Sequence, residues 1–442
     1  MRRFRLEAVL VVFLVGALAV ALVLRGTPGD PAADLGDTET SDPLGRPTPC
    51  IQALLGEPAP GPAAADADVA SVAPLVEEIR ELSFEEEPEP VYLAPGPLRE
   101  RVDDMVDEID DRLEIQGRLL AELGALPEQI DLGREVEDLL GEQVAGFYDS
   151  ETEELVVAAD AIEEGLSTTE LLTLVHELEH ALADQRLGIP DLDTLNEEDQ
   201  DAASAAQSLV EGDAQLTTEI YAARSLSPSD QLAASGEEVP GLDDVPHYLA
   251  RSLLFPYVEG ARFACALYRE GGWDAVDDAY LALPRSTAEI LFPDRYGSGD
   301  EPTDPPDPRG LPAPWEEAET LTFGAADLLF LFEAPGDDPT HGLAGARDLV
   351  RPWAGGEVHV WTWGERTAVG LVLAASDGEA LCGSVTAWWQ RAAGDAEERT
   401  QEVPGSALAT EGPERGGVLY CVGGSVRLGI CQELAVARAA VR

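Results

Sequence analysis

The stretch His176-Glu177-Leu178-Glu179-His180 decides the interpretation of this chain, because it uses two of only five histidines in 442 residues. On an α-helix, residues four positions apart lie on one face about one turn from each other, so both imidazoles can reach one ion. Glu177 falls beside them, where its carboxylate can polarise a water at that ion. The simpler alternative is a helix whose two histidines bind no metal.

The residues around the motif predict a helix. Ser167 and Glu170 match a capping box, in which a hydroxyl accepts early backbone N–H groups and a glutamate lies three residues on. Gly188 and Pro190 follow where a C-cap and a helix breaker are expected. Between them an apolar stripe recurs at helical spacing, at Leu171, Leu174, Val175, Leu178 and Leu182. The histidines lie off this stripe, on a face that can border a cleft.

Two histidines leave a tetrahedral zinc ion short of one protein ligand and a water. A metzincin would supply Gly and His at fixed positions beyond the motif, but Ala183 and Arg186 stand there, so that class is excluded. A gluzincin instead takes a glutamate from a following helix. Glu211 suits this role, because it lies 31 residues beyond His180 and off the apolar stripe of its own predicted helix, 201–224.

Two other acids, Asp213 and Glu219, compete with Glu211 for this position. Gly212 favours Glu211, because a glycine inside a helix costs about 1 kcal/mol and so indicates a close approach to another element. The simpler explanation for any of these acids is a solvated helix surface.

The string VHELEHALADQ at 175–185, followed by LVEGDA at 209–214, resembles a group of uncharacterised exported zinc metallopeptidases of gluzincin type. Their pattern runs close to HELTHALQDQ and then LVEGDA. The resemblance covers about residues 71–298 and includes further matches, namely VAGFYD at 144–149, FPYVEG at 255–260 and GGW at 271–273.

This resemblance implies a zincin-like fold with one zinc ion. In that fold His176, His180 and Glu211 bind the ion, and Glu177 is catalytic. Asp213 would orient a ligand or the helix end from behind the ligands. One departure bears on activity: the group has a stretch like STEQILHP where this chain has STAEILFP at 286–293, so Phe292 replaces a histidine. If that histidine steadies the tetrahedral intermediate or the substrate, activity or specificity differs here.

The predicted function is a zinc-dependent metallopeptidase that hydrolyses peptide or protein substrates. Zinc lowers the pKa of its bound water towards about 7, and Glu177 is the general base that takes the proton and passes it to the leaving amine. A further group must stabilise the developing oxyanion. The candidates for that donor are Tyr257, His247, Tyr148 and Arg262.

Two other functions fit the same residues. A catalytically inactive zincin-fold module would keep the fold in order to bind peptide, cell wall or a partner protein. The intact Glu177 argues against this alternative, and Phe292 argues for it. The other alternative is a self-processing protein whose only substrate is its own linker.

The predicted fold class is α+β, with a mainly helical zincin-like domain, a small β-hairpin and a smaller C-terminal α+β domain. An N-terminal membrane segment (1–25) and a disordered linker (26–70) precede the metallopeptidase domain (71–298). A Pro-rich linker (299–320) joins that domain to the C-terminal domain (321–442).

Inside the metallopeptidase domain the pattern predicts a short helix from Val72 to Leu82, a strand at 91–93 and a helix at 98–123. A β-hairpin is expected at 144–160, just before the HExxH helix. Its free edge could pair with an extended peptide, or the hairpin could merely cover the core.

The first 25 residues predict an uncleaved membrane anchor. Arg2, Arg3 and Arg5 precede seventeen apolar residues, 8–24, which can span a bilayer when tilted. The basic flank stays inside, so the bulk of the chain lies outside the cytoplasmic membrane. The alternative is a cleaved signal and a secreted protein.

Net charge is −58, and all 28 basic residues are arginine. Self-repulsion of this size is tolerable where salt screens it, which favours a salt-rich habitat. Nucleic acid is excluded as a partner, because the chain has no basic stripe to meet phosphate.

The C-terminal domain carries two further signals. One disulfide is expected among Cys382, Cys421 and Cys431, with the pair left open. A cluster of tryptophans could bind carbohydrate, although such residues most often form core: Trp353, Trp361, Trp363, Trp388 and Trp389.

Overall fold

The computed structural model describes residues 59, 61–94, 96–98, 110–127, 130, 132–135, 146–150, 152–158, 165–227, 230, 245–305, 308–412 and 415–442. The predicted membrane segment 1–25 and most of the predicted linker lie outside these ranges. Among the described residues, no helix combines the length and the apolar character that crossing a membrane requires.

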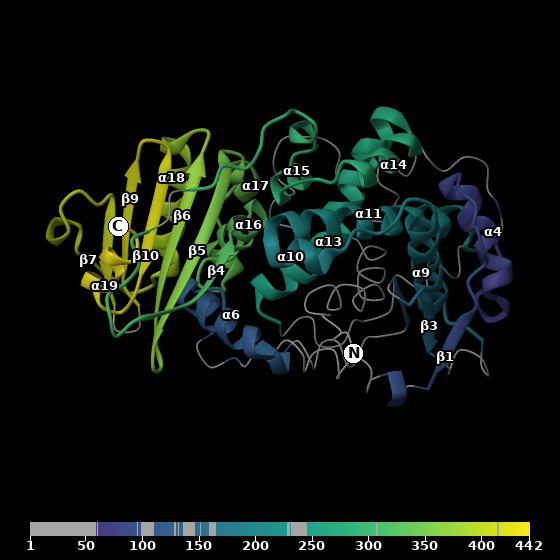
Figure 1. Cartoon of the computed structure of the whole chain (residues 1–442), viewed down its shortest axis with the longest axis horizontal. Helices are drawn as coiled ribbons and strands as arrows, with labels where there is room; N and C mark the ends of the chain where they lie inside the picture. The colour runs from purple at the N-terminus through teal and green to yellow at the C-terminus, as the bar shows by residue number, and fades with distance from the viewer. Residues whose placement is uncertain are drawn as a thin grey trace.

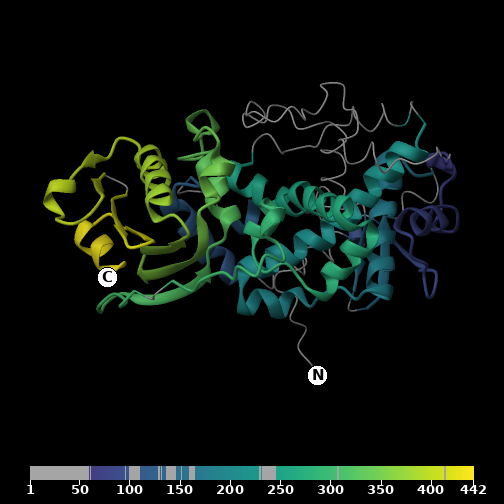
Figure 2. The same ribbon diagram turned by 90° about the horizontal axis from the view of Figure 1, so that it is seen from above.

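The fold is mixed α+β, with a helical portion and a seven-stranded antiparallel sheet side by side along the long axis (Figures 1 and 2). The main helices of the helical portion are α4 (Val69–Arg80), α9 (Thr168–Arg186), α11 (Gln200–Ser225), α13 (His247–Gly271) and α14 (Trp273–Leu281). Shorter elements between and beyond them are η1 (Ala64–Asp66), α10 (Leu192–Glu198), α15 (Thr287–Leu291) and η3 (Pro293–Arg295). Helix α11 contacts α4, α9, α13 and α14, and is therefore the central helix of this portion.

A three-stranded sheet lies against α9. Its strands are β1 (Pro90–Leu93), β2 (Gly146–Asp149) and β3 (Glu154–Ala158), in the order β1-β3-β2. Strands β2 and β3 form the predicted hairpin, antiparallel with Phe147 opposite Val156, and β1 pairs with β3 in parallel. Strand β2 contacts this helix, which carries the HExxH motif, at Glu177 and Asp184.

The C-terminal sheet has the order β4-β5-β6-β10-β9-β8-β7. Its strands are β4 (Glu316–Thr322), β5 (Trp353–Trp363), β6 (Arg366–Ala375), β7 (Glu397–Glu398), β8 (Leu408–Glu411), β9 (Gly417–Val422) and β10 (Ser425–Ile430). Helices in this part of the chain are α16 (Ala325–Glu333), α17 (Ala346–Val350), α18 (Gly378–Ala392), α19 (Leu434–Ala439) and the short η4 (Pro339–His341) and η5 (Thr400–Glu402). Side chains of α18 belong to one apolar cluster, and Ala437 of α19 belongs to a second, separate one. Strands contribute to both clusters, since alternate residues of a strand point to opposite faces of the sheet.

Helix α6 (Asp110–Leu123) joins the two portions, although it precedes α9 in the chain. It contacts β6, and Arg118 donates hydrogen bonds to Thr367 Oγ1 at 3.1 Å and to the carbonyl of Gly364 at 2.9 Å. One apolar cluster runs from α4 through α6, α11 and α13 to the seven-stranded sheet. The helical portion and the sheet therefore share packing.

Elements of the structure extend into both ranges that the sequence predicted as linkers. Strand β4 falls inside the range 299–320 predicted as linker; its first residues are exposed acids at the edge of the sheet, so no apolar alternation marks them. Helix α4 begins at Val69 instead of Val72, because Asp68 accepts a hydrogen bond from the Ser71 N–H as N-cap. Both η1 and the start of α4 thus lie inside the range 26–70 predicted as linker.

The tryptophan and cysteine predictions concern the same part of the fold. Four tryptophans are buried in its core, namely Trp353, Trp361, Trp388 and Trp389, while Trp363 is half-exposed. Cys382 and Cys421 form the disulfide, and Cys431 is free and buried. This burial favours the core explanation of the tryptophans over carbohydrate binding.

The tightest helix contact is between α11 and α13, at Gly212 and Gly260. A Cβ at Gly212 would lie 2.7 Å from the Cα of Gly260, closer than real side chains approach a backbone. Only glycine fits, so Gly212 sets the distance between the two helices, as its position inside α11 predicted.

We expect Gly212→Ala to lower the free energy of unfolding by about 1–3 kcal/mol, because backbone must move to admit the methyl group. Gly383→Ala is the matched control: Gly383 is also helical, in α18, but a Cβ there meets nothing within 4 Å. Gly383→Ala should be neutral or stabilise by up to about 1 kcal/mol. Denaturant unfolding of both variants measures the difference, and equal effects would contradict the close-contact explanation.

The start of α11 is tied to neighbouring elements by a buried carboxyl, that of Asp201. Its Oδ1 accepts a hydrogen bond from the Thr287 N–H at 3.2 Å, at the start of α15. Burial raises the pKa of Asp201 from its usual 3.8 to about 8, although the hydrogen bonds from Thr287 oppose the shift. Asp201 is therefore protonated in the folded protein at neutral pH.

This raised pKa predicts a pH dependence of stability. Between about pH 4 and pH 8 the folded protein binds a proton at Asp201 that the unfolded chain has lost. The contribution of this carboxyl to stability therefore falls as pH rises through that window, by at most about 1.4 kcal/mol per pH unit. In urea unfolding between pH 5 and pH 8, the free energy of unfolding of Asp201→Asn relative to that of the wild-type protein should rise with pH. A difference that stays constant with pH would refute the assignment.

Candidate metal centre

Helix α9 presents the HExxH motif from the interior of the protein. Its capping box forms as predicted: Ser167 Oγ accepts from the Glu170 N–H, and Glu170 Oε2 accepts from the Ser167 N–H. Every residue from Leu171 to Ala183 is buried, including His176, Glu177 and His180. Buried ionisable groups need partners, since transfer from water without them is costly. The contacts of these side chains therefore carry the functional argument.

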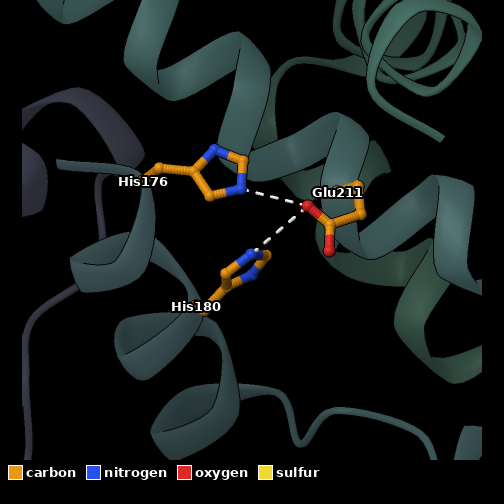
Figure 3. A group of neighbouring side chains, drawn as sticks. All are labelled: His176, His180 and Glu211. Atoms are coloured by element: carbon orange, nitrogen blue, oxygen red, sulfur yellow. Dashed lines mark hydrogen bonds and ion pairs between the residues drawn. The ribbon is translucent and has the colours of Figure 1, made fainter. Parts of the chain in front are cut away.

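The two histidines meet Glu211 of α11, as Figure 3 shows. His176 Nε2 lies 3.0 Å from Glu211 Oε2, and His180 Nε2 lies 3.5 Å from the same oxygen. All three side chains are at most 1% exposed. Burial alone would raise the pKa of Glu211, but the nearby imidazoles outweigh it and lower the pKa. One carboxylate oxygen thus faces both Nε2 atoms.

This donor set fits a zinc ion. Among the described residues, His176, His180 and Glu211 form a group in which one donor atom of each lies within 4.8 Å of the others. A tetrahedral ion with ligands about 2.0–2.1 Å away separates its donors by roughly 3.4 Å, and the two nitrogen–oxygen distances bracket that value. Two imidazoles and one carboxylate are a ligand set typical of zinc hydrolases.

Glu177 lies beside this group and is held by the backbone of β2. Its Oε2 accepts a hydrogen bond from the Tyr148 N–H at 2.8 Å, while Oε1 has no hydrogen-bond partner among the described residues. Burial raises the pKa of Glu177 to about 8, with Glu211 adding to the shift and His176 opposing it. A divalent cation at the triad would favour the charged form.

Strand β2 is fastened to α9 at a second point. The Tyr148 hydroxyl donates to Asp184 Oδ2 at 2.9 Å, and Asp184 Oδ1 accepts from the Ile189 N–H. Asp184 lies two turns beyond Glu177 on the same helix. Tyr148 therefore spans α9 from Glu177 to Asp184, which fixes the backbone N–H that binds Glu177.

Asp213 is bound by Arg80 of α4 and by Tyr280 of α14. Arg80 binds it, with Nε 2.9 Å from Oδ1 and Nη2 donating to Oδ2, and the Tyr280 hydroxyl also donates to Oδ2. Beside it, Glu179 Oε2 lies 3.9 Å from His180 Nδ1, and Arg80 Nε donates to Glu179 Oε1 at 3.3 Å. Burial raises the pKa of both Glu179 and Asp213, although Arg80 opposes the shift.

Sequence reasoning missed Glu179 and Arg80. Glu179 lies inside the motif, but spacing assigns no role to a residue between the two histidines. Arg80 is in the last turn of α4, where a basic side chain is expected for its interaction with the helix dipole and is usually solvated. Here it is fully buried. Only the tertiary packing of α4 on α9 and α11 reveals this role.

Of the four predicted oxyanion donors, Tyr257 is the one whose side chain lies next to the candidate ligands. It is fully buried, its ring is 5.9 Å from that of His176, and the charges of Glu211 and Glu177 act on its hydroxyl. The other three have partners elsewhere. Tyr148 OH binds Asp184, His247 Nε2 lies 3.1 Å from Glu333, and Arg262 donates to Glu259.

Phe292 directly follows α15 and lies near two arginines. Its ring lies 4.3 Å from the Arg351 guanidinium and 6.0 Å from that of Arg347, which binds Glu259. Glu259 and Tyr257 are two residues apart on α13, about 200° around the helix, so they point to opposite sides. Phe292 therefore lies near an arginine whose partner, Glu259, points to the side of α13 opposite Tyr257.

Comparison with known proteins adds no relative. No family model matches the chain, and neither the curated proteins nor the solved structures contain a match to it.

The distances separate Glu211 from its rival Glu219, which lies two turns further along α11 and receives a hydrogen bond from Gln215. We expect Glu211→Gln to weaken zinc binding by ~100-fold or more. Changes to residues that only support the ligands can already cost ~100-fold, and Glu211 is itself a candidate ligand. Glu219→Gln, the matched control, should keep stoichiometric zinc. Zinc titration against a chromophoric chelator measures both. Loss of zinc in the Glu219 variant alone would reverse the assignment.

Proposed function

We propose that this protein is a zinc-dependent metallopeptidase with a zincin-like fold, acting on peptide or protein substrates outside the cytoplasmic membrane. The observation that carries the proposal is the buried convergence of His176, His180 and Glu211 with Glu177 beside them. The N-terminal segment 1–25 would anchor the chain in the membrane. The alternative is secretion after cleavage of that segment.

The number of protein donors favours a catalytic ion over a structural one. Structural zinc sites close the tetrahedron with four protein ligands, whereas catalytic sites use three and keep one position open. The described residues supply three donors, from His176, His180 and Glu211. When bound, zinc supplies a Lewis acid that polarises a carbonyl and lowers the pKa of a coordinated water towards about 7.

Glu177 is suited to the proton transfers. Its Oε2 is held by the Tyr148 N–H, and its Oε1 has no hydrogen-bond partner in the described part of the chain. A pKa raised by burial makes its carboxylate a stronger base than a solvated glutamate. Glu177 can therefore take a proton at Oε1 and return it to the leaving amine.

Tyr257 is the best placed group to stabilise the oxyanion. Burial raises its pKa well above 10, and the charges of Glu211 and Glu177 act in the same direction. The hydroxyl thus stays protonated and is a hydrogen-bond donor, which is directed at Glu211 in this structure and could turn to an oxyanion when substrate is bound. Tyr257 lies on α13 about one turn before Gly260, where the glycine contact sets the distance between α13 and α11.

The disulfide supports an exported location. Cys382 and Cys421 are bridged, and disulfides persist in oxidising compartments outside the cytosol. A net charge of −58 is consistent with surroundings in which salt screens the charge. The same acid excess would repel the phosphates of nucleic acid.

We expect Glu177→Gln to abolish hydrolysis of casein by the full-length protein while keeping stoichiometric zinc. The reason is that glutamine preserves the shape and the bond to the Tyr148 N–H but cannot accept the proton. Loss of general-base catalysis alone costs about 10²–10⁴-fold in rate. A chelator should inhibit the wild-type protein, and added zinc should restore it.

Three outcomes would contradict the proposal in different ways. Equal activity of the wild-type and Glu177→Gln proteins would remove Glu177 from the mechanism. Zinc binding without hydrolysis of any peptide or protein tested would favour the inactive binding module. A chelator-sensitive change in the mass of the protein itself, with no other substrate cleaved, would favour self-processing.

A further inference from the structure

We infer that Arg80 is a positioning residue for the metal centre, holding α9 and α11 at the separation at which His180 and Glu211 converge. The inference rests on the proposed function, since it concerns the same centre. It assigns a role to the N-terminal helix α4, which supplies none of the candidate ligands.

Arg80 connects four helices through one buried guanidinium. From α4 it binds Glu179 on α9, Asp213 on α11 and Asp277 on α14. The nitrogen–oxygen distances are 3.3, 2.9 and 2.8 Å. The guanidinium also lies 4.3 Å from the ring centroid of Trp273 on α14, a distance typical of a cation–π contact. These four helices lie in the right-hand half of Figure 1, away from the seven-stranded sheet.

Two of the carboxylates that Arg80 binds are next to candidate zinc ligands in the chain. Glu179 adjoins His180, and its Oε2 faces the ring nitrogen Nδ1 that points away from Glu211. Asp213 lies two residues beyond Glu211 on α11. Arg80 therefore grips each ligand-bearing helix beside its ligand, and a shift of either helix would strain its contacts.

The chemistry explains why arginine occupies this position. A guanidinium offers five N–H donors in a rigid planar fork, so it can bind three carboxylates in fixed directions and stack on an indole at the same time. A lysine ammonium is a point charge on a flexible stem and fixes no such geometry. The position thus requires the shape of arginine as well as its charge.

The test compares Arg80→Lys with Arg347→Lys in the full-length protein. Arg347 is a matched control, because it also joins two helices through a buried carboxylate, Glu259, on the side of α13 away from the triad. The readouts are the dissociation constant for zinc, from competition with a chromophoric chelator, and the stability of the metal-free protein in urea. We expect Arg80→Lys to weaken zinc binding about tenfold or more. Arg347→Lys should change it less than about twofold, even where both variants lose similar stability.

A second variant keeps the test decisive if Arg80→Lys fails to fold. Asp277→Asn removes one partner of Arg80, at a side chain that is 24% exposed. Arg80 keeps Glu179 and Asp213, so its buried charge is not left unpaired. It should weaken zinc binding several-fold. Unchanged zinc affinity in the folded Arg80 and Asp277 variants would overturn the inference, as would equal weakening by Arg347→Lys.

The result also separates this inference from the proposed function. If the wild-type protein binds no zinc, both fail. If it binds zinc and the Arg80 variant binds it more weakly, the inference stands even when no hydrolysis is detected. Cobalt in place of zinc gives a further readout, because its visible absorption reports the coordination geometry and should change in Arg80→Lys but not in Arg347→Lys.

Discussion

The cost of burying charge is the constraint on which this structure depends. Glu177, Glu179, Glu211 and Asp213 lie between α9 and α11 almost without access to water, together with two histidines. Groups of this kind are tolerated in an interior only when hydrogen bonds or opposite charges compensate them. Arg80 compensates the carboxylates of Glu179 and Asp213, and a backbone N–H of β2 compensates that of Glu177. The carboxylate oxygen of Glu211 faces the imidazoles. The incompletely compensated groups, His176, His180 and Glu211, are where a cation would bind.

Helix α11 transmits this constraint to the rest of the molecule. Its first turn binds Thr287 through Asp201, its middle carries Glu211, and Gly212 brings it close to α13. The contact with α13 also places Tyr257 next to His176. The positions of the candidate ligand Glu211, the phenol of Tyr257 and the start of the helix are thus set by one rigid element.

Local features of the fold could be predicted from the sequence, whereas few long-range contacts could. The capping box, the motif helix and the hairpin before it depend on residues close together in the chain, where spacing is informative. Two long-range features left a signal: Gly212 is a glycine inside a helix, and Glu211 stands in a stretch that carries the family resemblance. Strand β4 was missed because an exposed acidic edge has no apolar periodicity. Arg80 was missed because its partners lie 99, 133 and 197 residues away. Pattern alone also proposed four oxyanion donors, of which packing brings one to the centre.

The contact of α6 with the seven-stranded sheet has a consequence for how this chain can be divided. Arg118 binds the β5–β6 hairpin, and leucines of α6 belong to the apolar cluster that continues into that sheet. A fragment cut at residue 298 would keep α6 but leave it without β6, so an apolar surface would face water. The helical portion and the seven-stranded sheet are therefore better regarded as one packed unit than as two independent pieces.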